Sequence, residues 1–170
     1  MPPAIQHSLR LFWLIILSAA LSACTVQLAP SYDDALAEGL AEANTRALTL
    51  FASVEDGSTP EQFPAYAVSY ATVIGRFDAL QQRAEARQIP PLATRLTRLG
   101  IVQSVCGGGA EATGCVNASP ASIGEVLRQL RDMRRIHRTR GLTAGDVQLY
   151  RDSYNPAIHQ ALTVESALRR

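Results

Sequence analysis

Four arginines in the second half of the chain have the spacing of an anion-binding surface. They follow one another at steps of three, four and three residues, which places them on one side of an α-helix. The four are Arg128, Arg131, Arg135 and Arg138. A guanidinium group binds phosphate or carboxylate bidentately, so this arginine stripe would suit anionic lipid headgroups or an acidic protein partner. The alternative is a solvated face whose arginines pair with acidic residues of the same chain.

The other reactive side chains form no catalytic or metal-binding motif. His137 falls on the inner face of the same predicted helix, where a single histidine is more often a hydrogen-bonded core residue than a ligand. His159 falls on the outer side of the last predicted helix, and the chain lacks the H-x₃-H, H-E-x-x-H and G-x-S-x-G patterns. All 16 basic residues are arginine, which excludes P-loop, Schiff-base and Ser-Lys chemistry. We therefore predict no catalytic residue, metal or cofactor.

Aromatic side chains offer a second candidate site. Four tyrosines lie on the inner faces of two predicted helices and could line a ligand groove between them: Tyr66, Tyr70, Tyr150 and Tyr154. The alternative is that they are packing residues whose hydroxyl groups reach the edge of the bundle. Glu165 lies near the same inner face, close to a helix end, where we expect a carboxylate to be exposed or paired with an arginine.

The first 24 residues have the features of an export signal. Arg10 is the only charged residue before Cys24, and an uncharged run from Leu11 to Ala23 follows it. This run is too short to span a bilayer comfortably, because a spanning helix needs about 20 apolar residues. A short positive leader, an apolar run and small residues before a cleavage point are typical of a secretory signal peptide.

The tetrad Leu21-Ser22-Ala23-Cys24 resembles the lipobox of bacterial lipoproteins. The resemblance covers only the signal and the cysteine. It implies cleavage after residue 23, a diacylglyceryl group on the thiol of Cys24 and acylation of the new amine, which together anchor the chain stably in a bilayer. It also implies that Thr25, which is not aspartate, is compatible with the outer membrane. The alternatives are an ordinary cleaved signal peptide and an uncleaved anchor.

Cys106 and Cys115 would then form the remaining cysteine pair. The glycine-rich segment between them is flexible enough for the two sulfurs to meet, and disulfides persist in the oxidising environment of an exported protein. We expect a structural disulfide, which would stabilise the fold by roughly 2–3 kcal/mol. A reactive thiol is the alternative, but no neighbouring histidine or lysine would lower its pKa.

The composition of the mature chain argues against several functional classes. Removing residues 1–23 would leave 147 of the 170 residues, enough for one domain with a sizeable core. It would also remove Trp13, the single tryptophan, and leave 15 arginines against 15 acidic residues. This balance argues against a general nucleic-acid-binding protein, which would have a basic excess.

Apolar residues recur at helical spacing through most of the mature chain. We expect helices over residues 31–54, 59–89, 92–106, 119–140 and 143–168, with the third weakened by Gly100 and the fifth kinked at Pro156. The predicted N-caps include Ser31, Thr59 with Gln62, and Thr143 with Asp146, and Gly141 is the predicted C-cap of the fourth helix.

These elements predict an all-α fold, an antiparallel bundle of four to five amphipathic helices. The expected organisation is a signal peptide (1–23), a lipidated N-terminus and tether (24–31) and a periplasmic bundle domain (32–170). The expected function is that of a non-enzymatic structural or interaction module of the cell envelope. Its partners would be the bilayer and an anionic lipid or an envelope protein. The alternative is a lipoprotein that binds a small ligand or lipid between the second and fifth helices.

Overall fold

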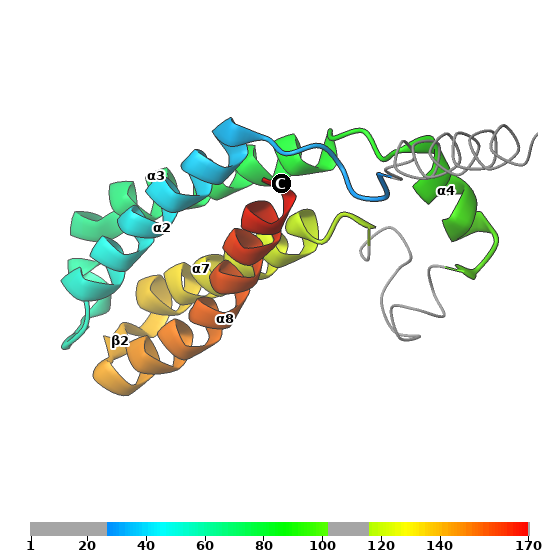
Figure 1. Ribbon diagram of the computed structural model, residues 1–170. Helices are drawn as coiled ribbons and strands as arrows, with labels where there is room; N and C mark the ends of the chain where they lie inside the picture. The colour runs from blue at the N-terminus through cyan, green and yellow to red at the C-terminus, as the bar shows by residue number, and fades with distance from the viewer. Residues whose placement is uncertain (1–26, 102–115, 170) are drawn as a thin grey trace, which may run out of the picture.

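The computed structural model describes residues 27–101 and 116–169, and their fold is all-α (Figure 1). Four long helices form an antiparallel bundle: α2 (Asp34–Ser53), α3 (Phe63–Glu85), α7 (Ser119–Arg140) and α8 (Ala144–Leu168). A fifth and shorter helix, α4 (Pro91–Arg98), lies beyond one end of the bundle. The predicted fold class is confirmed.

The four long helices pack in a ring in which each contacts two neighbours. The helix α2 packs against α3 and α8, and α7 packs against the same two helices from the other side. The helices α3 and α8 are therefore diagonal partners. The predicted apolar stripes supply the core between them, and its largest fully buried apolar side chains are Tyr70, Tyr154, Phe51, Phe77, Leu36, Leu40, Ile123, Leu127, Leu130, Met133 and Ile158.

The two tight loops of the bundle meet at one end, which we call the hairpin end. There the short strands β1 (Gly57–Ser58) and β2 (Leu142–Thr143) pair in antiparallel fashion, followed in the first loop by a 3₁₀ turn, η1 (Pro60–Gln62). The opposite end, where α2 begins and α3 leads towards α4, we call the α4 end (Figure 1). The strand pair ties the α2–α3 loop to the α7–α8 loop.

Most of the predicted helix boundaries are confirmed. The side chain of Gln62 accepts a hydrogen bond from the Thr59 backbone at 2.9 Å, and Thr143 and Asp146 form the expected reciprocal capping box. Gly141 ends α7 as predicted. The predicted N-cap Ser31 is wrong, because Asp33 caps α2 by accepting from Leu36 N at 3.1 Å. The carboxylate of Asp33 also accepts a hydrogen bond from Arg83.

The prediction for the third helix is also wrong in part. The helix α4 ends at Arg98 with Leu99 as its C-cap, and Gly100 follows with a positive φ of +72°. Leu92 and Leu99, expected on a buried face, are exposed, and α4 makes no extensive contact with the bundle helices. Within residues 27–101 and 116–169, the bundle therefore consists of four helices.

The proline inside the last helix does not interrupt it. The helix α8 runs continuously through Pro156, which is exposed on the solvent side as expected. A proline is tolerated there because the solvent side can hydrate the carbonyl group that loses its backbone donor.

Candidate functional site

Ion pairs within the chain neutralise most of the arginine stripe of α7. Arg131 donates to Asp78 of α3 at 2.7 Å and Arg135 pairs with Asp132 at 3.1 Å. Arg128 pairs with Glu125, whose pKa the guanidinium lowers. Arg138 is the one member of the stripe for which the described part of the chain shows no ion pair. The alternative of an internally paired, solvated face therefore fits three of the four arginines.

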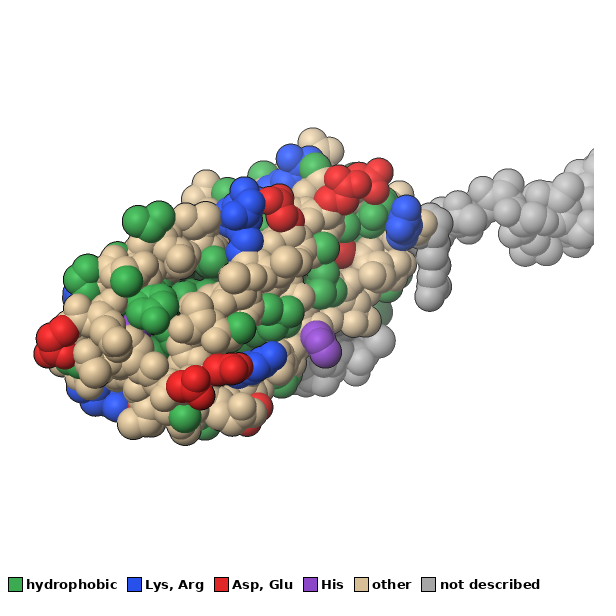
Figure 2. Space-filling view, turned by 90° about the vertical axis from the view of Figure 1, so that its left-hand side faces the viewer, with side chains coloured by type: hydrophobic (Ala, Val, Ile, Leu, Met, Phe, Trp, Pro, Cys, Tyr) green, Lys and Arg blue, Asp and Glu red, His purple; other side chains and the backbone are tan. Residues whose placement is uncertain are grey.

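The face seen in Figure 2 carries charges of both signs. Arginines and acidic side chains are interspersed on that face, with small apolar areas between them, and no large area carries one sign of charge. Long-range attraction to an anionic surface requires an excess of positive charge. The face in Figure 2 shows no such excess.

Two of the four candidate tyrosines lie in the core and the other two pack at its edge. Tyr70 and Tyr154 are fully buried, and Tyr66 and Tyr150 pack against the core while partly exposed. The hydroxyl group of Tyr154 donates to Asn44 of α2 at 2.9 Å. The helices that carry them, α3 and α8, are diagonal in the bundle, so their inner faces are filled by packing. The structure therefore favours the packing alternative over the predicted groove between these two helices.

His137 is the hydrogen-bonded core histidine that its position predicted. It is fully buried, with its Nδ1 3.2 Å from the Tyr70 hydroxyl group and its ring packed against Phe63 and Tyr66. Its Nε2 is buried without a hydrogen-bond partner among the described residues. Burial lowers the pKa of His137 below its ordinary value of 6.5, and the nearby Thr59 backbone only partly offsets this.

This environment predicts a loss of stability in mild acid. The unfolded chain protonates His137 as the pH falls through 6.5, whereas the folded protein keeps it neutral to a lower pH. The unfolded state then binds more protons, so the free energy of unfolding should fall between about pH 7 and pH 5. Urea unfolding should show this fall in the parent and in His159→Gln, whose histidine is exposed, and a shallower one in His137→Gln. An unchanged pH slope in His137→Gln would contradict the prediction.

A buried ion pair closes the α4 end of the bundle. The Arg87 guanidinium, just beyond α3, donates to both carboxylate oxygens of Glu165 in α8 at 2.9 and 2.8 Å. The two side chains are only 7% and 1% exposed. Ser119, at the start of α7, donates to the same carboxylate. With Ser119, the pair joins three elements, and of the two expected alternatives for Glu165, exposure or pairing with an arginine, the pairing is confirmed.

Asn117 extends this cluster and fixes the chain around it. Its side chain accepts from Arg87 at 2.8 Å and donates to the Ala84 carbonyl at 2.9 Å, which holds the end of α3 against the start of α7. Arg87 is not identifiable from the sequence, because no local pattern marks an arginine just after a helix as a partner for a carboxylate 78 residues away. Both charges are paired, so this cluster is suited to holding the fold together and not to proton transfer.

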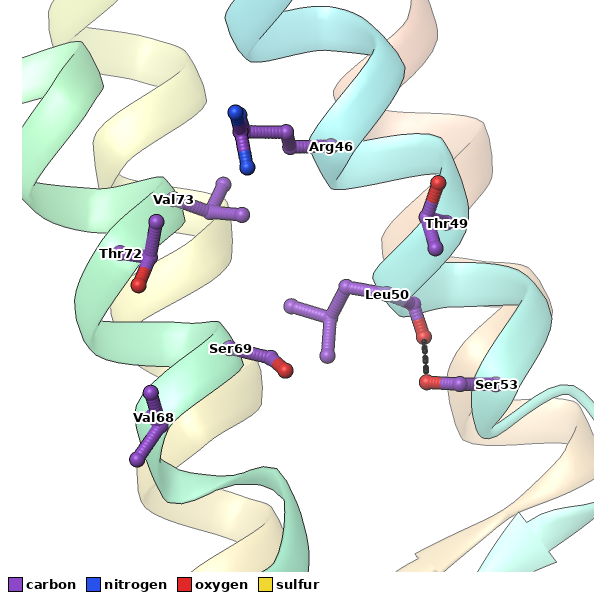
Figure 3. Close-up of a pocket in the computed structure, with 8 residues that line it drawn as sticks. All are labelled: Arg46, Thr49, Leu50, Ser53, Val68, Ser69, Thr72 and Val73. Carbon is purple, nitrogen blue, oxygen red and sulfur yellow. Dashed lines mark hydrogen bonds between the residues drawn. The ribbon is translucent and has the colours of Figure 1, made fainter.

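A groove of about 330 Å³ runs between α2 and α3 (Figure 3). Buried Leu50 and Val73 form its floor, and side-chain hydroxyl groups of both helices lie along it. The hydroxyl-bearing residues are Thr49, Ser53, Ser69 and Thr72. The hydroxyl group of Ser53 is already engaged with the Leu50 carbonyl at 2.7 Å. Arg46, the one ionisable residue of its lining, pairs with Glu42, so the groove has no acid–base group to offer.

No model of a known protein family matches this chain. Neither the characterised proteins nor the solved structures gave a match to it. Function must therefore be argued from the residues themselves.

Three predicted modification sites fall outside the described residues: Cys24, Cys106 and Cys115. Within the described ranges, no helix combines the length and the apolar character needed to cross a bilayer. In the same ranges, histidine, cysteine and acidic residues form no group of three or more that could hold a metal ion.

Proposed function

We propose that this protein is a lipid-anchored, non-enzymatic interaction module of the cell envelope. The observation that carries the proposal is the tetrad Leu21-Ser22-Ala23-Cys24 at the end of a short apolar run. The acyl chains on Cys24 would provide the attachment, and the helical bundle would provide a rigid surface facing the periplasm. The outer membrane is favoured because Thr25, and not aspartate, follows the cysteine.

The chain between Cys24 and the bundle supports a close attachment. Pro30 is buried, the Tyr32 ring lies under the Arg169 guanidinium at 5.9 Å, and Asp33 pairs with Arg83 at 2.6 Å. The segment expected to be a free tether to residue 31 is therefore fixed from Pro30 onwards. The five residues between Cys24 and Pro30 reach roughly 18 Å at full extension. The α4 end of the bundle would then lie beside the membrane, with the hairpin end pointing away.

The buried polar groups support a structural role for the bundle. His137 bonds to Tyr70, and Glu165 is paired with Arg87. A catalytic site of the usual kind places such groups in a cleft, where a substrate can reach them. A disulfide between Cys106 and Cys115 remains part of this proposal, as the bond that would restrain the loop after α4 in an exported protein.

One observation favours the ligand-binding alternative, namely the α2–α3 groove. Its volume of about 330 Å³ is near the lower bound for ligand sites, which enclose most of the ligand surface. This groove is open along its length, and the exposed Val68 stands at its edge (Figure 3). Its position differs from the predicted site between α3 and α8. The groove suits a side chain of a partner protein better than an enclosed small molecule.

Replacing Cys24 tests the proposed function directly. In the parent, expressed in a Gram-negative host, mass spectrometry should find a mature chain that begins at Cys24 and carries fatty acids. Cys24→Ala should lose incorporated palmitate, because a single cysteine provides the acyl attachment. Cys106→Ser is the matched control and should keep its palmitate. Acylation that persists in Cys24→Ala, or a mature chain that starts elsewhere, would refute the proposal.

A further inference from the structure

The helix α4 exposes its apolar side. Leu92 is 41% exposed and Leu99, the C-cap of the helix, is 71% exposed, whereas Ala93 is completely buried. Helical geometry places Leu92, Leu96 and Leu99 on one side of α4 and Ala93 about a quarter-turn away. A helix that packs on a bundle normally buries its leucines. Here the small residue is buried, Leu92 and Leu99 are exposed, and Leu96 is half-buried between them.

The charged residues of α4 itself, Arg95 and Arg98, are both positive. Arg95 and Arg98 are exposed, and the described part of the chain shows no ion pair for either. No acidic residue occurs between Glu85 and Glu111. This differs from α7, where acidic neighbours neutralise most of the arginines. A leucine face flanked by unpaired arginines is the pattern of a helix that lies in a membrane interface.

The position of α4 brings this face to the membrane-proximal end of the protein. The start of α2 and the connection from α3 to α4 lie at the same end of the bundle (Figure 1). The Arg87 cluster fixes the point of departure four residues before α4 begins. If Cys24 is acylated, the short link to Pro30 holds this end against the bilayer.

We propose that α4 is a second membrane contact, whose leucine face inserts into the headgroup region of the anionic bilayer that holds the lipid of Cys24. This inference rests on the proposed function. The leucines supply the apolar contact, and Arg95 and Arg98 bind lipid phosphates. The two attachments, one covalent and one through α4, would fix the orientation of the bundle on the membrane, which one flexible link cannot do.

A tryptophan placed on α4 reports this contact. The mature chain would contain no tryptophan, since Trp13 lies in the leader, so Leu99→Trp introduces a single fluorophore. The acylated protein is reconstituted in vesicles of phosphatidylcholine and phosphatidylglycerol with a nitroxide lipid labelled near the headgroup. We expect blue-shifted emission and about a two-fold loss of intensity, since interfacial helices bury their apolar face at this depth. Leu149→Trp is the matched control, because Leu149 is 65% exposed near the hairpin end, and its emission should be unaffected.

A second pair of variants tests the role of the arginines. Arg95→Gln with Arg98→Gln should remove most of the dependence of quenching on phosphatidylglycerol. Arg131→Gln with Arg135→Gln, which removes two paired arginines of α7, should leave that dependence unchanged.

Mass spectrometry of the same preparation shows whether Cys24 is acylated, which distinguishes failure of this inference from failure of the proposed function. If Cys24 is acylated and Leu99→Trp behaves like Leu149→Trp, the inference is overturned while the proposed function stands. If Cys24 carries no lipid, the proposed function fails and the inference fails with it. A blue shift that appears in native envelopes but not in pure lipid vesicles identifies a protein partner and overturns the lipid contact.

Discussion

Arg87→Ala is expected to lower the free energy of unfolding by about 3–5 kcal/mol, because it leaves the carboxylate of Glu165 buried without a countercharge. Glu165 is 1% exposed, and Ser119 would remain as its one described side-chain donor. The variant also deprives Asn117 of a donor and releases the link between the ends of α3 and α8. Urea unfolding at neutral pH, followed by circular dichroism, measures the effect.

Arg83→Ala is the matched control for this prediction. Arg83 lies one helical turn earlier and pairs with Asp33, but its side chain is 52% exposed. Exposed pairs contribute about 0–1 kcal/mol, so the control should change stability little. If the two variants are equally stable, the Arg87–Glu165 pair does not hold the α4 end together.

Loss of this pair should also affect the position of α4. Arg87 is bound to both α8 and the start of α7, and α4 follows it within four residues. Releasing Arg87 removes the fixed point from which α4 projects. The cluster therefore connects the stability of the bundle to the proposed membrane contact.

Gly141→Ala is expected to destabilise the fold by about 2–4 kcal/mol. Gly141 has φ +81° and ψ −179°, a conformation that is essentially restricted to glycine. A Cβ atom there would also lie 2.6 Å from the Ser58 carbonyl oxygen and 3.0 Å from Pro60 Cδ. Neither neighbour can yield easily, because Ser58 is paired with Leu142 and Pro60 begins η1. Thermal and urea unfolding should both report the loss.

Gly75→Ala is the control for the glycine prediction and should have the opposite sign. Gly75 lies inside α3, and an added Cβ atom would meet nothing within 4 Å. Alanine in a helix interior is favoured over glycine by roughly 0.5–1 kcal/mol, so this variant should be more stable than the parent. Equal effects of the two substitutions would show that the hairpin end does not depend on the conformation of Gly141.

Local patterns predict the four long helices because helix formation depends on residues that are close together in the chain. The apolar stripe from Leu36 to Val54 is entirely buried, as its periodicity indicated, and His137 lies in the core as expected. Capping at Thr59 and Thr143 depends on residues only three positions apart. Such features follow from helical geometry and remain readable without knowledge of the neighbouring helices.

The predictions about sites were less successful because they depended on which helices are neighbours. The tyrosines of α3 and α8 were correctly placed on inner faces, but these helices are diagonal, so the expected groove is core. The spacing of the arginine stripe was read correctly. However, the partner of Arg131 is Asp78 on another helix, which spacing within α7 cannot reveal.

The sequence by itself determined the helical class, most of the helix ends and the inward faces, because these depend on residues close together in the chain. Only the tertiary structure decided that Arg87 meets Glu165, that α2 and α3 form the groove, and that Leu92 and Leu99 are exposed. An amphipathic pattern indicates that one face of a helix needs an apolar partner, but it does not identify that partner. For α4 the structure places that face outside the bundle.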